Sequence, residues 1–386
     1  MGKGTSGQFA IGVIGGGQLA RMMHAASIGL GVQIRLLAEG PDVSAAQVVH
    51  HVTVGDYTDP ATVMAFARDC DVITFDHEHV PPGILHDLQR AGIAVRPGPD
   101  ALVHAQDKTV MRARLGALGV PCPTNRVVAD PAELVAFGNE IGWPVIAKTS
   151  RGGYDGKGVW RITGAAQASE PFTGLADGVQ IVAEELVDFA RELSALVVRS
   201  PSGQAVAYPV SETVQRDGIC VETTTPAPGL PADRAIGAQQ LALGIARDLG
   251  VVGLLAVELM ERRTGEVVVN ELAMRPHNTG HWSIDGAHTS QFNNHLRAVL
   301  DLPLGDPSAR APWTVMTNVL GGGEPDLTSA LLHCFARDRK LRVQLYGKEV
   351  KPGRKVGHVV CFGEDLDDVR KRARHAAGYL MGDSSA

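Results

Sequence analysis

The chain has 386 residues, of which 44% are hydrophobic and 20% are charged, and its formal net charge at pH 7 is −6. This length allows two or three domains with buried cores, and the composition is ordinary for a soluble globular protein. Neither nucleic acid nor a membrane surface is expected as a partner, because the chain is acidic and has no dense run of lysine and arginine.

The cysteines and the N-terminus indicate a reducing compartment. Five cysteines are scattered without a C-x-x-C pair, which argues against a zinc site or a disulfide framework. The apolar run Phe9–Ile14 is too short for a signal sequence, and no stretch approaches the length of a transmembrane helix. We therefore expect a cytoplasmic protein.

The first hundred residues alternate between β-rich runs and helical stretches. We expect strands at Phe9–Ile14, Val32–Ala38, Val48–Val54, Asp71–Phe75 and Ile93–Val95, with helices ending near Ile28 and spanning Pro60–Asp69. Such alternation predicts an open parallel sheet with helices on both faces. The fold class of residues 1–100 is therefore α/β, and we expect a Rossmann-like domain.

Two segments of this domain carry candidate binding residues. Gly15–Ala20 matches G-x-G-x-x-A between a strand and a helix, and Glu39 ends the second strand. This weak dinucleotide fingerprint fits a phosphate ester as well as NAD, and a tight turn without a ligand is the alternative. Glu78 follows the fourth strand, at the sheet edge where ligands bind, and is either a ligand contact or a solvated loop acid.

The rest of the chain predicts two further domains. After Pro97–Pro99 we expect a helix carrying Lys108 and then a linker at Gly119–Pro123. Strands follow at Val145–Thr149, Val179–Glu184, Glu192–Arg199 and Gln204–Tyr208, with long helices at Ala232–Leu249 and Gln291–Leu300. We expect a domain of mixed pattern at 101–305. A small β-rich C-terminal domain at 306–386 ends in a helix at Asp365–Leu380, which makes the whole chain a multi-domain α/β and α+β protein.

The segment Lys148–Gly158 (K-T-S-R-G-G-Y-D-G-K-G) is the strongest single indication of function. Its four glycines let backbone N–H groups approach an anion, and its lysines add positive charge for phosphate oxygens. It is not a Walker loop, because no G-K-[ST] leads into a helix. A flap over a nucleotide triphosphate and a mobile surface hairpin both fit it.

Two acids follow an expected strand in Val182–Val187. Backbone groups there can hold an adenine, and a carboxylate can hold a ribose. Surface hinges with two acids are common, so this indication is weak on its own.

The segment Gly253–Asn278 predicts a metal site. Two β-rich runs flank Thr264-Gly265, which predicts a two-residue hairpin that places Glu258 opposite Glu271. Two facing carboxylates repel, and Mg²⁺ between them would remove that conflict. Asn270 lies on the other side of an ideal strand and reaches the metal only if the strand end twists. A solvent-facing acid pair is the alternative, but the face of Glu258 is largely apolar.

Two more clusters indicate anion binding. Arg275, His277, Asn278 and His281 lie within seven residues and fit a small planar anion such as bicarbonate. The segment Lys348–Lys355 puts four cations around a turn, which indicates a second phosphate site or a solvated basic hairpin.

In this order, the segments resemble the ATP-grasp superfamily, and within it the 5-(carboxyamino)imidazole ribonucleotide synthetase family. The resemblance spans about Phe9–Phe362 and is most specific at G-G-G-Q-L-A-R-M, G-G-Y-D-G-K-G, N-E-L-A-M-R-P-H-N-T-G-H-W and K-P-G-R-K-V-G-H. It implies an ATP-dependent carbon–nitrogen ligase of purine biosynthesis. ATP would convert bicarbonate to carboxyphosphate, which carboxylates the exocyclic amine of 5-aminoimidazole ribonucleotide. The resemblance also implies Mg²⁺, with Mn²⁺ as the alternative ion, and a homodimer. It further implies that the domain at 101–305 is an ATP-grasp domain in two lobes, with a lid subdomain at about 122–190, and that 1–100 is a pre-ATP-grasp domain.

The resemblance assigns roles to single residues. ATP would contact His104, Lys108, Lys148, Gly153, Tyr154, Asp155, Gly156, Lys157, Gly158, Glu184, Glu185, Leu186, Val187, Glu192, Gln215, Asn270 and Glu271. Glu258 and Glu271 would ligate the metal. The catalytic set would be Arg275, His277, Asn278, Tyr154, Asp155 and Lys157, and the ribonucleotide would contact Gly17, Gln18, Leu19, Glu78, Lys348, Arg354 and Lys355. His104 stands where an arginine is expected and Gln215 where a histidine is expected, but both can donate hydrogen bonds.

Three other functions are weighed against this one. A biotin carboxylase-like or formate-using ATP-grasp ligase would share the nucleotide site, but Lys348–Lys355 favours a phosphorylated small acceptor. An NAD-dependent oxidoreductase would explain only Gly15–Ala20 and Glu39. A catalytically dead nucleotide-binding regulator would not need the acid pair and Lys148.

Overall fold

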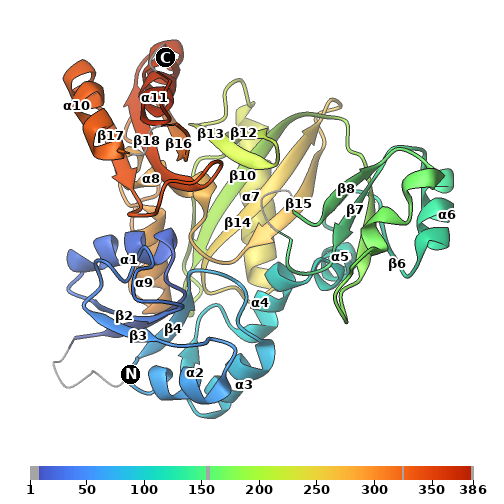
Figure 1. The fold of residues 1–386 in the computed structure, drawn as a ribbon, viewed down its shortest axis with the longest axis horizontal. Helices are drawn as coiled ribbons and strands as arrows, with labels where there is room; N and C mark the ends of the chain where they lie inside the picture. Colours follow the sequence, from blue (N-terminus) through green and yellow to red (C-terminus); the bar gives the residue numbers. More distant parts are fainter. Residues whose placement is uncertain (1–7, 154–156, 324–325, 384–386) are drawn as a thin grey trace.

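The computed structural model describes residues 8–153, 157–323 and 326–383 (Figure 1). These residues form a five-stranded, a four-stranded and a nine-stranded sheet with helices packed against them. The predicted class, a multi-domain chain of mixed α/β and α+β type, is confirmed.

The first sheet is parallel, in the order β3-β2-β1-β4-β5. Its strands are β1 (Ala10–Ile14), β2 (Gln33–Ala38), β3 (His51–Val54), β4 (Val72–Phe75) and β5 (Ala94–Val95). Its helices are α1 (Gln18–Ile28), α2 (Pro60–Ala67) and α3 (Pro82–Arg90). All residues of β1 and β4 are buried, because apolar clusters cover both faces of the sheet.

The third strand begins three residues later than predicted. The amides of Val48 and Val49 both bond to the carbonyl oxygen of Ala45, which makes this segment a turn and delays β3 until His51. β-propensity alone does not reveal such a turn.

A break at Asp107 divides the predicted helix around Lys108 into α4 (Pro99–Gln106) and α5 (Lys108–Ala117). Asp107 has an extended backbone, and its side chain accepts hydrogen bonds from the amides of Thr109 and Val110. This cap sets Lys108 at the start of α5, where its side chain can face the centre of the molecule.

The four-stranded sheet is antiparallel, in the order β6-β9-β7-β8, and projects to one side of the molecule (Figure 1). Its elements are β6 (Asn125–Val128), α6 (Pro131–Ile141), β7 (Val145–Thr149), β8 (Val159–Ile162), η1 (Ala165–Gln167), η2 (Glu170–Phe172) and β9 (Ile181–Glu185). It has its own apolar core around Phe137. The glycine-rich segment after Lys148 connects β7 to β8.

The nine-stranded sheet has the order β15-β14-β10-β12-β13-β16-β18-β17, and β11 pairs with β10. The strands are β10 (Phe189–Arg199), β11 (Ala205–Ala207), β12 (Ser211–Arg216), β13 (Ile219–Thr225), β14 (Gly253–Arg262), β15 (Val267–Ala273), β16 (Trp313–Leu320), β17 (Arg342–Leu345) and β18 (Lys355–Gly363). The helices are α7 (Ala232–Asp248), η3 (Asn278–Gly280), α8 (Ser283–Gly286), α9 (Gln291–Val299), α10 (Leu327–Arg337) and α11 (Leu366–Leu380). Because β13 pairs with β16, one sheet continues across the predicted domain boundary at 305/306.

The β14–β15 hairpin differs from its prediction. Gly265 N donates to the Arg262 carbonyl at 2.8 Å, and Arg262 N donates to the Glu266 carbonyl at 2.8 Å. The loop therefore has three residues, ending in Gly265 at φ +88°, and the predicted two-residue loop is wrong. A bulge at Asn270 then shifts the register by one residue, so that Glu258 still pairs with Glu271, as predicted.

Candidate active site

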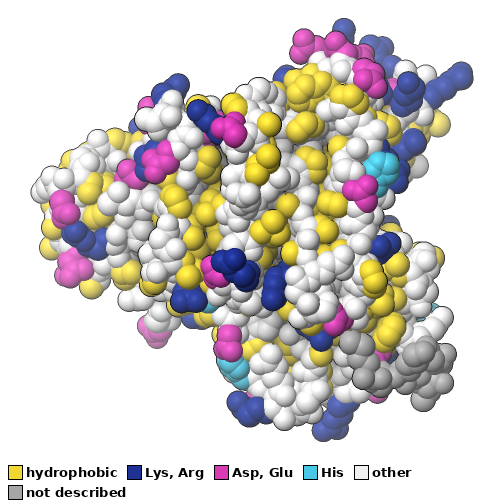
Figure 2. Space-filling view, turned by 180° about the vertical axis from the view of Figure 1, so that it is seen from behind, with side chains coloured by type: hydrophobic (Ala, Val, Ile, Leu, Met, Phe, Trp, Pro, Cys, Tyr) yellow, Lys and Arg dark blue, Asp and Glu magenta, His cyan; other side chains and the backbone are white. Residues whose placement is uncertain are grey.

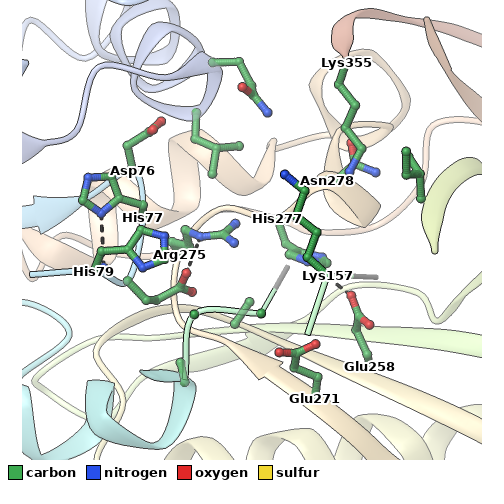
Figure 3. Close-up of a pocket in the computed structure, with 18 of the residues that line it drawn as sticks. Asp76, His77, His79, Lys157, Glu258, Glu271, Arg275, His277, Asn278 and Lys355 are labelled. Carbon is green, nitrogen blue, oxygen red and sulfur yellow. Dashed lines mark hydrogen bonds and ion pairs between the residues drawn. The ribbon is translucent and has the colours of Figure 1, made fainter. Parts of the chain in front are cut away.

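A cleft opens between the parallel domain, the β14–β15 hairpin and the segment 348–355 (Figure 3). Its larger part has a volume of about 730 Å³. The smaller part, of about 330 Å³, extends toward β7 and β8. Both parts are lined by Lys108, Lys157, Glu258, Glu271 and His277, so they form one continuous site.

Glu258 and Glu271 form the acidic wall of this cleft (Figure 3). The surrounding protein, then Glu271 and Glu192, raise the pKa of Glu258 to about 7. Glu271 is 3.0 Å from Lys108 Nζ, whereas Glu258 has His277 Nε2 at 3.4 Å. The pair therefore carries carboxylate charge that the nearby cations only partly offset, which favours binding of a divalent cation.

Lys148 lies at the edge of the acidic wall, at the end of β7. Its Nζ is 3.1 Å from Asn270 Oδ1 and 2.8 Å from Glu184 Oε2. The bulge turns Asn270 toward the smaller cavity together with Glu271, which removes the obstacle expected from ideal pleating. Glu184 is only 2% exposed, and its other oxygen accepts from Arg112 Nε at 2.7 Å.

The segment after β15 places three polar side chains in the cleft. Arg275 Nε donates to Glu78 Oε2 at 2.7 Å, and Met274 N donates to the other oxygen of Glu78 at 3.1 Å (Figure 3). Glu78 thus holds the start of this segment through both a side chain and a backbone amide, so the loop acid has a defined structural contact.

His277 and Asn278 face the same cavity. Burial, then Arg275 and Lys355, lower the pKa of His277 to about 3, so its imidazole is neutral at pH 7. The side-chain nitrogen and oxygen of Asn278 are buried, yet among the described residues neither has a hydrogen-bond partner. Such a donor–acceptor pair is unsatisfied unless a ligand or water meets it.

The turn Gly15–Ala20 makes contacts that differ from those of a dinucleotide fingerprint. Gly16 N donates to Glu39 Oε2 at 3.0 Å, and Gly17 N and Ala20 N donate to Asp76 at 3.0 and 2.7 Å. The chain's own carboxylates therefore occupy the amides that a pyrophosphate would need, which removes the main support for an NAD site. Gln18 and Leu19 remain as lining residues of the larger cavity.

The basic segment closes the other side of the cleft. Lys348 Nζ contacts Gln18 Oε1 and lies over the Tyr346 ring, and Arg354 and Lys355 line the same cavity. The structure thus brings together positive groups that are more than three hundred positions from Gln18 in the sequence.

Several predicted ATP contacts do not line the two cavities. His104 Nδ1 is 3.0 Å from the Ala101 carbonyl, and Glu185 bonds to Thr124 N and contacts Arg262. Leu186 is exposed, Val187 is buried, and the two oxygens of Glu184 are already paired.

Glu192 and Gln215, which were also predicted to contact ATP, do line the smaller cavity. The nucleotide contacts of all these residues stay predictions, and Tyr154, Asp155 and Gly156 lie outside the described residues.

Two further residues differ from expectation. His281 is fully buried, packs against Phe292 and His358 and contacts Gln291, so its expected place in the anion pocket is wrong. Arg112, which the sequence analysis missed, is a buried part of the wall behind Lys148. Its only signal in the sequence is its spacing of four from Lys108, which puts both on one helix face.

Comparisons with known proteins cover almost the whole chain. A ribonucleotide synthetase preATP-grasp domain matches residues 9–106, an ATP-grasp domain matches 113–292, and a phosphoribosylaminoimidazole carboxylase C-terminal domain matches 314–372. The N5-carboxyaminoimidazole ribonucleotide synthase of Mycobacterium tuberculosis (strain ATCC 25618 / H37Rv) is 54% identical over 96% of this chain and 87% of its own length. The enzyme of that name from Corynebacterium ammoniagenes is 46% identical over 97% of this chain and 92% of its own.

Solved structures give the same result. An ADP complex of an N5-carboxyaminoimidazole ribonucleotide synthetase superposes with a TM-score of 0.89 at 32% identity, covering 98% of each chain. The N5-carboxyaminoimidazole synthase of Aspergillus clavatus, in complex with ADP and 5-aminoimidazole ribonucleotide, has a TM-score of 0.89 at 29% identity, covering 97% of this chain and 98% of its own. The chain therefore belongs to the N5-carboxyaminoimidazole ribonucleotide synthase family of ATP-grasp enzymes.

Proposed function

We propose that this protein carboxylates the exocyclic amine of 5-aminoimidazole ribonucleotide with ATP and bicarbonate, in de novo purine biosynthesis. ATP phosphorylates bicarbonate to carboxyphosphate and leaves as ADP. Carboxyphosphate then carboxylates the amine, giving N5-carboxyaminoimidazole ribonucleotide and phosphate. The observation that carries this proposal is a single cleft with an acidic wall and lysines at one end, a basic segment at the other, and Asn278 unsatisfied between them.

The chain's own residues divide the work along this cleft. Lys108 and Lys148 bind the triphosphate, and Lys157 approaches it from the glycine-rich segment. The Arg275 guanidinium and the Asn278 amide hold bicarbonate, because planar forks suit a planar anion. His277 lines the cleft as a neutral hydrogen-bonding group, because its pKa is lowered to about 3. The phosphate released from carboxyphosphate accepts the proton that the amine loses.

A divalent cation fits the residues present. Glu258 and Glu271 face each other on paired strands and both line the two parts of the cleft, so their oxygens can meet one cation. Mg²⁺ held there would neutralise phosphate oxygens during transfer, and Mn²⁺ is the alternative ion.

We also propose a cytoplasmic homodimer, as the family resemblance implies. In the part of the chain that the structure describes, no helix has the length and apolarity to span a membrane.

Acceptor dependence tests the function directly. Purified protein should release phosphate from ATP only when bicarbonate and 5-aminoimidazole ribonucleotide are both present, and the product should carry one added carboxylate by mass. Equal phosphate release without the ribonucleotide would rule out this acceptor.

Glu271→Ala tests the acidic wall. We expect turnover to fall by a factor of about 10³ or more, because phosphoryl transfer depends on charge stabilisation at this position. Circular dichroism should show an intact fold. Glu266→Ala is the control, since Glu266 is exposed on the same hairpin and should leave activity unchanged. Normal turnover in Glu271→Ala would refute the metal role.

A further inference from the structure

Arg112 connects three parts of the nucleotide wall from the interior of α5. It is 4% exposed. Its Nε donates to Glu184 Oε1 at 2.7 Å, its Nη1 to the Val269 carbonyl at 2.9 Å, and its Nη2 to the Asn270 carbonyl at 2.8 Å. One planar guanidinium therefore joins the end of β9 to two consecutive carbonyls of β15.

Those two carbonyls belong to the β-bulge of the acidic wall. Leu259 pairs with Val269 and Glu258 pairs with Glu271, so Asn270 is the extra residue. Without this extra residue, Glu271 would lie opposite Val257 and would point to the other face of the sheet. β15 is the outer strand of the nine-stranded sheet, and carbonyls that point away from β14 in a buried place need a donor from elsewhere. Arg112 is that donor.

The bond from Arg112 to Glu184 also holds Lys148 in place, because Lys148 contacts the same carboxylate. Glu184 lies between Arg112 and Lys148, at 2.7 and 2.8 Å, and is 2% exposed. Burial alone would raise the pKa of Glu184, but Lys148 and Arg112 outweigh burial and lower it. Because one carboxylate is shared between two cations, the group of three keeps a net positive charge at the edge of the cavity.

We propose that Arg112 is a positioning residue for phosphoryl transfer: it fixes the bulge and the Glu184 carboxylate so that Lys148, Asn270 and Glu271 all face the ATP phosphates. Arg112 itself lines neither cavity and touches no reacting atom. This role presupposes the ATP-dependent reaction proposed above. A lysine cannot replace it, because an ammonium group is compact and lacks the planar fork that reaches three acceptors.

Arg112→Lys separates positioning from folding. The substitution keeps the positive charge beside Glu184, so it does not leave a buried carboxylate unpaired. We expect the variant to fold, with an unfolding midpoint only moderately below that of the wild type, because the buried carbonyls of Val269 and Asn270 lose their donor. We also expect kcat to fall at least about tenfold and KM for ATP to rise, while KM for the ribonucleotide stays within about threefold, because only the nucleotide half of the cleft is disturbed.

Calorimetric titration with ADP in the presence of Mg²⁺ gives a readout that needs no turnover. Affinity for ADP should fall about tenfold in Arg112→Lys. Arg114→Met is the matched control, because Arg114 lies two residues away on the exposed side of α5 and donates only to the Asp248 carbonyl among the contacts described. The control should match the wild type in every measurement.

The possible failures are distinguishable. A folded Arg112→Lys protein with kcat, KM and ADP affinity all within twofold of the wild type would overturn the positioning role, as would a loss confined to KM for the ribonucleotide. A wild-type protein that binds ADP but releases no phosphate with bicarbonate and the ribonucleotide would contradict the proposed function instead.

Discussion

Glu258 stands in surroundings that oppose its ionisation. Its side chain is 28% exposed in the cleft, and its partial burial, then the negative charge of Glu271 and Glu192, raises its pKa from 4.5 to about 7. The same unfavourable charge that makes the acid pair costly in the empty protein makes it suited to a cation. The repulsion between Glu258 and Glu271 thus lowers the stability of the protein at the position proposed for the cation.

A pH-dependent stability follows for Glu258. Because its pKa is raised on folding, the folded protein holds the Glu258 proton more tightly than the unfolded chain does. Stability is therefore lost as pH rises from about 4.5 through about 7. Without ligands, Glu258→Gln should raise the free energy of unfolding by about 1–3 kcal/mol at pH 8 and have little effect at pH 5.

Urea unfolding at the two pH values measures this difference. Glu266→Gln, on the exposed end of the same hairpin, should show no comparable pH dependence. An equal effect of Glu258→Gln at both pH values would mean that Glu258 ionises normally in the folded state.

Among single residues, the sequence predicted which side chains line the same cleft more accurately than which side chains form ion pairs with each other. The facing of Glu258 and Glu271 was predicted from strand pairing about Thr264-Gly265, and Arg275, His277 and the basic segment do line one cavity. Glu184 was assigned to the nucleotide, yet Arg112 and Lys148 take both its oxygens. Such pairing depends on the packing of α5 against β9, and no local pattern encodes it.

The hairpin β14–β15 shows how two errors at the level of elements can cancel. The loop is one residue longer than predicted, and the bulge at Asn270 is one residue that the prediction lacked. Together they restore the predicted Glu258–Glu271 pair. Thr264-Gly265 indicated the position of the turn but not its length, and the bulge is held by Arg112, which comes from a distant helix. Long-range contacts of this kind limit prediction from local sequence.

The β7–β8 connection allows a test at this scale. Gly158 has φ +69°, and a Cβ there would lie 2.5 Å from Thr149 Oγ1. Gly158→Ala should therefore shift the glycine-rich segment and lower kcat/KM for ATP at least about tenfold, because small misplacements of phosphate-binding groups are costly. Steady-state kinetics with varied ATP checks this.

Gly164→Ala provides the control in the same four-stranded unit. Its backbone is extended, and a Cβ would have no neighbour within 4 Å. We expect wild-type kinetics from it. Similar losses in both variants would point to general destabilisation of the unit rather than to the phosphate-binding segment.

One side of the cleft is formed by residues from near the beginning of the chain and residues from near its end. Gln18 comes from the first domain, whereas Lys348 follows β17 and is carried by the nine-stranded sheet. On the face shown in Figure 2, basic and acidic side chains are interspersed. The separate motifs were visible in the sequence, but their meeting across the cleft depends on how the sheets pack.

Lys348→Met tests this arrangement. If Lys348 binds the ribonucleotide as proposed, KM for the ribonucleotide should rise about tenfold or more, while KM for ATP should change less than about threefold. Lys351→Met is the control, because Lys351 is exposed and pairs with Glu349 in the same segment. A rise in KM for ATP alone would contradict the proposed division of the cleft.

The pairing of β13 with β16 covers an edge of the sheet that would otherwise be open to strands of other molecules. If the chain ended at residue 305, the long edge of β13 would lose its partner, and Glu222 would lose Arg370 and Arg374. An open edge of this kind is a template for adding strands from other copies. The last eighty residues therefore cover this edge as well as line the cleft, and a chain shortened at that boundary should aggregate.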